Sequence, residues 1–68
     1  MTRDQARAAC LTPACVSNND KFIIVQTDNG EVIEGHHSEP YAQRCMGWLM
    51  DHERRCGRNT EYHIQPLD

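Results

Sequence analysis

The sequence has no long apolar stretch: no hydrophobic run approaches the roughly 18 residues that a membrane-spanning helix needs. Its first ten residues, MTRDQARAAC, also lack the apolar core of a secretory signal peptide. We therefore expect a cytoplasmic protein without a membrane partner. In that compartment thiols stay reduced, so the four cysteines need not form disulfides. In an oxidising setting, Cys10 and Cys15 could instead close a small loop.

The motifs that usually carry enzyme chemistry are missing as well. There is no glycine-rich phosphate loop, no G-x-S-x-G turn and no H-E-x-x-H sequence. Asp51-His52-Glu53 is not a proton relay, because consecutive residues of a helix point in different directions. A Cys56–His52 pair is conceivable at one-turn spacing, but so short a chain has little room for a substrate pocket. We expect no enzymatic activity and no cofactor.

Positive charge is scarce: seven Lys and Arg residues stand against ten Asp and Glu residues, for a net charge of −3. This balance gives no general attraction to nucleic acid or to anionic membranes. The charges are segregated, because residues 20–39 hold one lysine and five acids (1 − 5 = −4), whereas residues 40–58 hold four arginines and two acids (4 − 2 = +2). Such segregation can steer a charged partner.

A chain of 68 residues has a small core. It buries only about 60% of its unfolded surface, so a disulfide, a metal or a second subunit would add needed stability. The first 19 residues are predicted to form an arm, in which Thr2 caps a short helix over Arg3–Ala9 that Leu11–Pro13 should end. Residues 20–68 are predicted to form the domain.

A β-hairpin is predicted from KFIIVQT (Lys21–Thr27) and EVIEG (Glu31–Gly35). Between them, Asn29-Gly30 is typical of a two-residue type I′ turn, which needs positive φ at both positions. This turn would place Val25 opposite Glu34.

The first predicted strand is apolar on both faces, with Ile24 on one side and Ile23 and Val25 on the other. One helix can cover only one face of a sheet, so the other face needs a second layer. The arm, through Leu11 and Val16, a second copy of the chain or another protein could supply that layer. Together with the small core, this pattern favours a homodimer or a partner-bound module.

Ser38 is a suitable N-cap, and the following Glu-Pro suits a first helical turn, so a helix is predicted over Glu39–Cys56 with Gly57 as its stop. Thr60–Gln65 alternates polar and apolar residues and predicts a last strand. The predicted fold class is α+β: a small three-stranded antiparallel sheet packed on one helix, in the order β-β-α-β, with a short N-terminal helical arm.

At 100° per residue, six helix positions share a stripe about 100° wide that should face the core. They are Tyr41, Ala42, Cys45, Leu49, His52 and Cys56. The thiols and the imidazole are therefore interpreted as packing, with no metal site. The alternative is a zinc-stapled domain whose ligands are Cys10, Cys15, His52 and Cys56.

His36 and His37 end the second predicted strand beside Glu34 and Glu39. They point to opposite faces and cannot chelate one ion together. We interpret them as a solvated junction; the alternative is a pH-sensitive contact with one of the glutamates.

Trp48 lies at the edge of the predicted buried stripe, with Arg44 and Arg55 close enough for cation–π contact. Tryptophan, arginine and methionine are enriched where proteins bind proteins. The predicted partner-binding residues are Trp48, Arg44, Arg55, Asp51, Glu31 and Glu34. They predict a non-catalytic module that docks a larger protein, as a regulator, an adaptor or an inhibitor, for example a phage or mobile-element inhibitor of a host defence complex.

Nucleic-acid binding is the remaining alternative, through the arginine-rich helix end. Arg44, Arg54, Arg55 and Arg58 supply the positive charge, but Asp51 and Glu53 interrupt the patch. Nucleic acid is therefore the less favoured partner.

Overall fold

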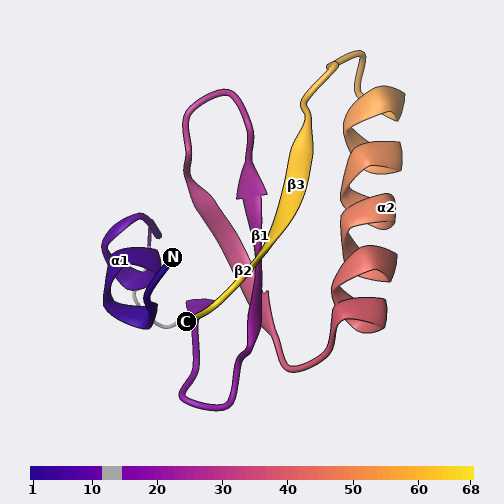
Figure 1. Cartoon of the computed structure of the whole chain (residues 1–68). Coiled ribbons are helices and arrows are strands. Elements are labelled where there is room, and N and C mark those ends of the chain that lie inside the picture. The colour runs from indigo at the N-terminus through magenta and orange to yellow at the C-terminus, as the bar shows by residue number, and fades with distance from the viewer. Residues whose placement is uncertain (12–14) are drawn as a thin grey trace.

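The computed structural model describes residues 1–11 and 15–68, and its three strands form one antiparallel sheet in the order β2-β1-β3. The elements are α1 (Arg3–Ala8), β1 (Phe22–Gln26), β2 (Val32–His36), α2 (Glu39–Arg55) and β3 (Tyr62–Pro66). The predicted α+β fold is confirmed. Figure 1 shows the sheet in the middle, with α1 on one side and α2 on the other. Neither described helix is long and apolar enough to cross a membrane. Thr12 and Pro13, predicted to end the first helix, lie outside the described residues.

The central strand β1 is buried on both faces. Ile23 and Ile24 are fully buried, and Val25 is 2% exposed. Because successive side chains of a strand point to opposite faces, Ile23 and Val25 face one layer and Ile24 faces the other. Ile23 and Val25 pack in one cluster with Ala6 and Val16 of the arm, while Ile24 faces α2.

The arm therefore supplies the second layer that the sequence demands. The apolar character of both faces of β1 therefore no longer favours a second subunit. Val16 is in the core as expected, but Leu11 is 88% exposed and covers little of the sheet. The division of the chain into an arm (residues 1–19) and a domain (residues 20–68) stays a prediction.

Hydrogen bonds hold the arm in place. Thr2 and Gln5 form a capping box at the start of α1, as the N-cap prediction requires. The Arg3 guanidinium donates to the backbone carbonyls of Ser17 and Asp20, at 2.6 and 2.9 Å. At the end of α1, the carbonyl of the C-cap residue Ala9 accepts a bond from the Val32 amide at the edge of β2 (3.0 Å). Both ends of α1 are thus tied to the domain.

A disulfide joins Cys10 and Cys15 in the arm. The sequence leaves the state of this pair open, and in the structure it is oxidised, whereas Cys45 and Cys56 are free thiols. Disulfides of this kind are typical of oxidising compartments. The cytoplasmic location therefore stays a prediction that the redox state of this pair can test.

The hairpin is confirmed, but its predicted turn and register are wrong. Only glycines have positive φ among the described residues, so Asn29 cannot occupy the left-handed region that a type I′ turn requires. Residues 27–30 form a four-residue loop instead, closed by a 2.9 Å bond from the Gly30 amide to the Gln26 carbonyl. This longer loop pairs Val25 with Val32 rather than with Glu34, so both valines lie on the face that the arm covers. A bulge follows in β2 at Ile33, so that Ile24 pairs with Glu34.

Helix α2 begins and ends close to its predicted limits. Ser38 is the N-cap residue, although its side chain makes no capping bond, and Pro40 lies in the first turn. At the other end, Gly57 has a φ of 79° and its amide bonds to the carbonyl of Arg54. A further bond, from the Arg58 amide to the Glu53 carbonyl, completes a Schellman motif.

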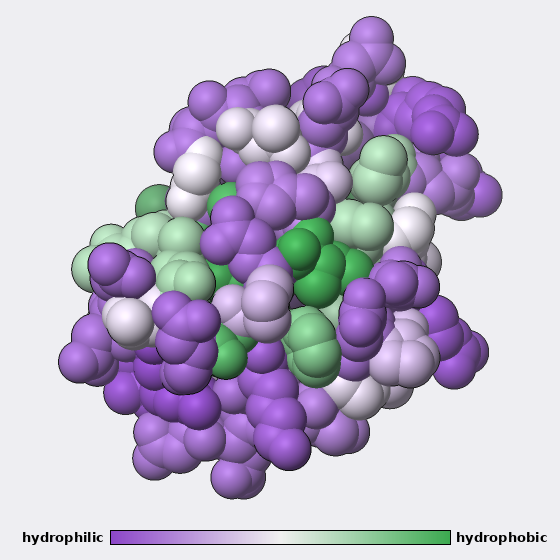
Figure 2. Space-filling model, in the orientation of Figure 1, coloured by the Kyte–Doolittle hydropathy of each residue, from purple (hydrophilic) through white to green (hydrophobic). Residues whose placement is uncertain are grey.

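The core is small. Seven hydrophobic residues of the described chain are buried: Ala6, Val16, Ile23, Ile24, Val25, Val32 and Ala42. Figure 2 shows further hydrophobic residues reaching the surface in a band across the middle of this face, between hydrophilic regions. The fold therefore depends on a few well-buried side chains rather than on a large interior.

The two-sided burial of β1 predicts matched effects of Ile23→Val and Ile24→Val. Each substitution deletes one buried methylene and should lower the free energy of unfolding by about 0.5–1.5 kcal/mol. Urea unfolding followed by circular dichroism measures this loss. Leu11→Ala is the control and should change stability by less than about 0.5 kcal/mol, because Leu11 is exposed. No loss in Ile23→Val beside a clear loss in Ile24→Val would mean that the arm does not cover its face.

Candidate functional site

Helix α2 presents a different face to the sheet from the one predicted. Ala42 is fully buried and Cys45 and Leu49 are half-buried, as expected. Tyr41, His52 and Cys56 were also expected inside, but they are exposed. Their interpretation as core filling is wrong.

Met46 and Met50 are half-buried in their place, together with Glu53. The buried face is thus centred near Ala42 and rotated by roughly 50° from the predicted stripe. Two features account for this rotation. Ala42 has a small side chain that allows close approach to the sheet, and flexible methionines fill irregular gaps.

The rotation leaves large side chains on the outer face of α2. Trp48 is 65% exposed and Tyr41 is 51% exposed. With Arg44 and Cys45 they line a shallow hollow of about 280 Å³. The Trp48 ring also stacks on the imidazole of His52, with centroids 5.3 Å apart and ring planes within 3°. This stacking gives the exposed indole a defined orientation.

Asp51 and Arg55 lie on the same outer face. Their side chains form an exposed ion pair at 3.1 Å with i,i+4 spacing, which stabilises the helix by no more than about 0.5 kcal/mol. Of the predicted docking residues, the structure thus places four on one side of α2. We call Tyr41, Arg44, Trp48, His52 and Arg55 the outer stripe, with Asp51 beside it.

The two predicted acidic residues of the hairpin are separated. Glu31 lines a different hollow of about 200 Å³, with Leu11 of the arm and Val32 and Ile33 of β2. It does not join the outer stripe. Glu34 lies further along β2 on the face toward α2, where its carboxylate is 2.9 Å from Nε2 of His36.

The two junction histidines differ. His37 is exposed, as expected of a solvated junction. The side chain of His36 is only 13% exposed, and its ring lies 5.4 Å from the ring of Tyr41. His36 is therefore part of the packing between β2 and α2, and for this residue the solvated interpretation is wrong.

The structure brings together three metal-ligating side chains that the sequence did not connect. One ligand atom from each of Glu34, His36 and Cys45 lies within 4.8 Å of the other two. Glu34 and His36 share a face of β2 because they are two residues apart in a strand. Their i,i+2 spacing was a visible signal. Cys45 was expected to face the sheet, but which strand residues it meets depends on how α2 packs.

The predicted alternative zinc ligands are not brought together. Cys10 and Cys15 are joined in a disulfide, and Figure 1 shows the arm across the sheet from α2. His52 and Cys56 do lie near each other on the exposed side of α2, with Nε2 and Sγ 3.9 Å apart.

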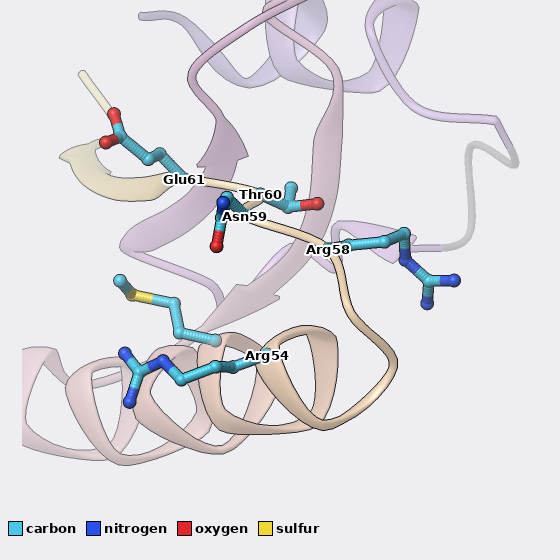
Figure 3. Close-up of a pocket in the computed structure, with 6 residues that line it drawn as sticks. Arg54, Arg58, Asn59, Thr60 and Glu61 are labelled. Carbon is cyan, nitrogen blue, oxygen red and sulfur yellow. The ribbon is translucent and has the colours of Figure 1, made fainter.

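The arginines at the end of α2 do not converge. A hollow of about 400 Å³ is lined by Met50, Arg54, Arg58, Asn59, Thr60 and Glu61. Figure 3 shows the guanidinium groups of Arg54 and Arg58 extending in opposite directions. Arg58 is moreover bound to the carboxylate of Glu53. This arrangement offers no two-arginine clamp for a phosphate.

Glu53 joins the end of α2 to β3. Its carboxylate accepts bonds from the Arg58 guanidinium and from the hydroxyl of Tyr62, the latter at 3.1 Å. The bond from Arg58 is the main reason that the pKa of Glu53 is lowered, and burial opposes it. The pKa of Tyr62 is raised, first by burial and then by its bond to Glu53.

No protein-family model, curated protein or solved structure matches this chain. Two features of the α2 side are candidates for function: the outer stripe, and the cluster of Glu34, His36 and Cys45.

The lowered pKa of Glu53 predicts a loss of stability in acid. The folded chain holds this proton less tightly than the unfolded chain, so the stabilisation is fully present above the ordinary value of 4.5 and is lost as the pH falls through the folded pKa. Tyr62 acts in the opposite range: its contribution is present below 10.0 and is lost as the pH rises through its raised pKa.

Urea unfolding at a series of pH values checks this dependence. Glu53→Gln should reduce the loss of stability below pH 4.5. The control is Glu61→Gln, in the segment between α2 and β3, which should leave this loss as in the parent chain. If Glu53→Gln and the parent chain showed equal acid sensitivity, the bonds to Glu53 would not be what stabilises this end of the helix.

Proposed function

We propose that the protein is a non-catalytic binding module that docks a larger protein through the outer stripe of α2. One observation carries the proposal: the single tryptophan of the chain is 65% exposed on this face. A 68-residue chain with a small core would gain stability by burying so large an apolar ring.

The composition of the stripe supports this proposal. Tyrosine, tryptophan and arginine are the residue types enriched among the energetically dominant positions of protein interfaces. Tyr41, Arg44 and Trp48 lie at i, i+3 and i+7, the spacing with which a helix enters a groove. The stacking of Trp48 on His52 limits the rotamer freedom that the ring would lose on binding.

The partner that fits this face is a protein with an apolar groove and acidic residues at its rim. The groove would receive the rings of Tyr41 and Trp48, and a carboxylate would pair with Arg44. Arg44 is exposed and forms no ion pair with any part of the chain that the structure describes. Regulators, adaptors and inhibitors all belong to this class, and the identity of the partner distinguishes them.

A photo-crosslinking amino acid at Tyr41 in the native cell should trap the partner, which mass spectrometry then identifies. The matched control carries the same group at Leu11, which is 88% exposed on the arm, across the sheet from α2. Crosslinks to a second copy of the chain would instead indicate a homodimer, and crosslinks to nucleic acid would support that alternative.

Calorimetry with the purified partner then tests the stripe. Trp48→Ala should weaken binding by at least about 2 kcal/mol, roughly 30-fold in Kd, because a central tryptophan supplies much of the contact energy. Leu11→Ala should leave the Kd unchanged. Equal affinities for the parent chain and Trp48→Ala would contradict the proposed docking face.

A further inference from the structure

We infer that Glu34, His36 and Cys45 form a zinc site that links β2 to α2. The ligand atoms would be a carboxylate oxygen of Glu34, Nε2 of His36 and Sγ of Cys45. These residues come from two elements, and in the folded chain they already lie within 4.8 Å of one another.

The separations are close to those that zinc requires. Zinc binds oxygen, nitrogen and sulfur at about 2.0–2.3 Å, so ligand atoms of a tetrahedral site lie about 3.3–3.8 Å apart. The observed group therefore needs adjustments of about 1 Å, which side-chain rotation can supply. The shared hydrogen bond between Glu34 and His36, now 2.9 Å, would open as both atoms turn to the metal.

The donor set selects the kind of metal. One thiolate, one imidazole and one carboxylate match the borderline preference of Zn²⁺ and are a poor match for Mg²⁺ or Ca²⁺, which prefer oxygen ligands alone. On binding, the Cys45 thiol loses its proton to the solvent, and the metal takes the resulting thiolate.

The surroundings distinguish this group from a chance surface cluster. All three residues are partly buried, and the ring of Tyr41 packs against His36. Three protein ligands leave a fourth coordination position, as in zinc sites that accept an outside ligand. Cys45 also lines the hollow beside Tyr41, Arg44 and Trp48, so the site adjoins the outer stripe.

The inference is independent of the proposed docking. The test uses the purified chain alone, without a partner. Reducing agents are left out so that the Cys10–Cys15 disulfide persists. Titration with Co²⁺ should give one equivalent of uptake with thiolate-to-cobalt charge-transfer absorption, and Zn²⁺ should displace the cobalt. Zn²⁺ should also raise the Tm of the chain, because it binds only the folded arrangement.

The chain offers a matched control on the same helix. Cys45→Ser should abolish the charge-transfer band, whereas Cys56→Ser, at the exposed His52–Cys56 pair, should retain it. Glu34→Gln and His36→Gln should each weaken Zn²⁺ affinity by more than about tenfold, since loss of a residue that only hydrogen-bonds to a metal ligand already costs about 10–100-fold. His52→Gln should leave the affinity unchanged.

Circular dichroism of each variant reports whether it is folded. Should Cys45→Ser fail to fold, Glu34→Gln, at a 39% exposed side chain, decides the question in its place. The inference is overturned if the parent chain takes up no Co²⁺, or if uptake depends on Cys56 and His52 and not on Cys45 and His36.

Discussion

The fold depends on the burial of β1 from both sides. Its three central side chains are almost wholly removed from water, and no single layer could achieve this. The arm covers Ile23 and Val25, and α2 covers the face of Ile24. Burial on both faces offsets the small size of the core, because each apolar side chain of β1 contributes about 1.5–3 kcal/mol when it is fully buried.

This arrangement decides which surfaces remain for function. The arm and α2 use their inner faces on the sheet. Among the described residues, the large apolar side chains left exposed are Leu11 of the arm and Tyr41 and Trp48 of α2. A lone exposed leucine is ordinary, whereas two aromatic rings around an arginine are typical of an interface. The same packing of α2 sets Cys45 beside Glu34 and His36 of β2, so the outer stripe and the proposed metal site both follow from how this helix lies on the sheet.

Sequence reasoning predicted the elements well and their side-chain orientations less well. The hairpin and the ends of α2 followed from local signals such as Gly57, whose positive φ is a local requirement. The rotation of α2 was not predicted, because Ala42, Cys45 and Leu49 fit both faces, and the helical spacing of Cys56 and His52 with them outweighed the greater hydrophobicity of Met46 and Met50. The predicted turn type was also wrong. Asn29-Gly30 permits a two-residue type I′ turn, but of these two residues only Gly30 adopts positive φ. The cluster at Cys45 depends on long-range packing and has no local signature.

The most direct test of this account is a set of methyl contacts measured by nuclear Overhauser spectroscopy in solution. The Ala6 methyl should show contacts to the methyls of at least one of Ile23, Val25 and Val32, with which it shares a cluster. The Ala42 methyl should show none of these contacts, because α2 lies on the opposite face. Absence of every contact from Ala6, with the arm amides exchanging as fast as those of an unfolded chain, would contradict burial of β1 from both sides.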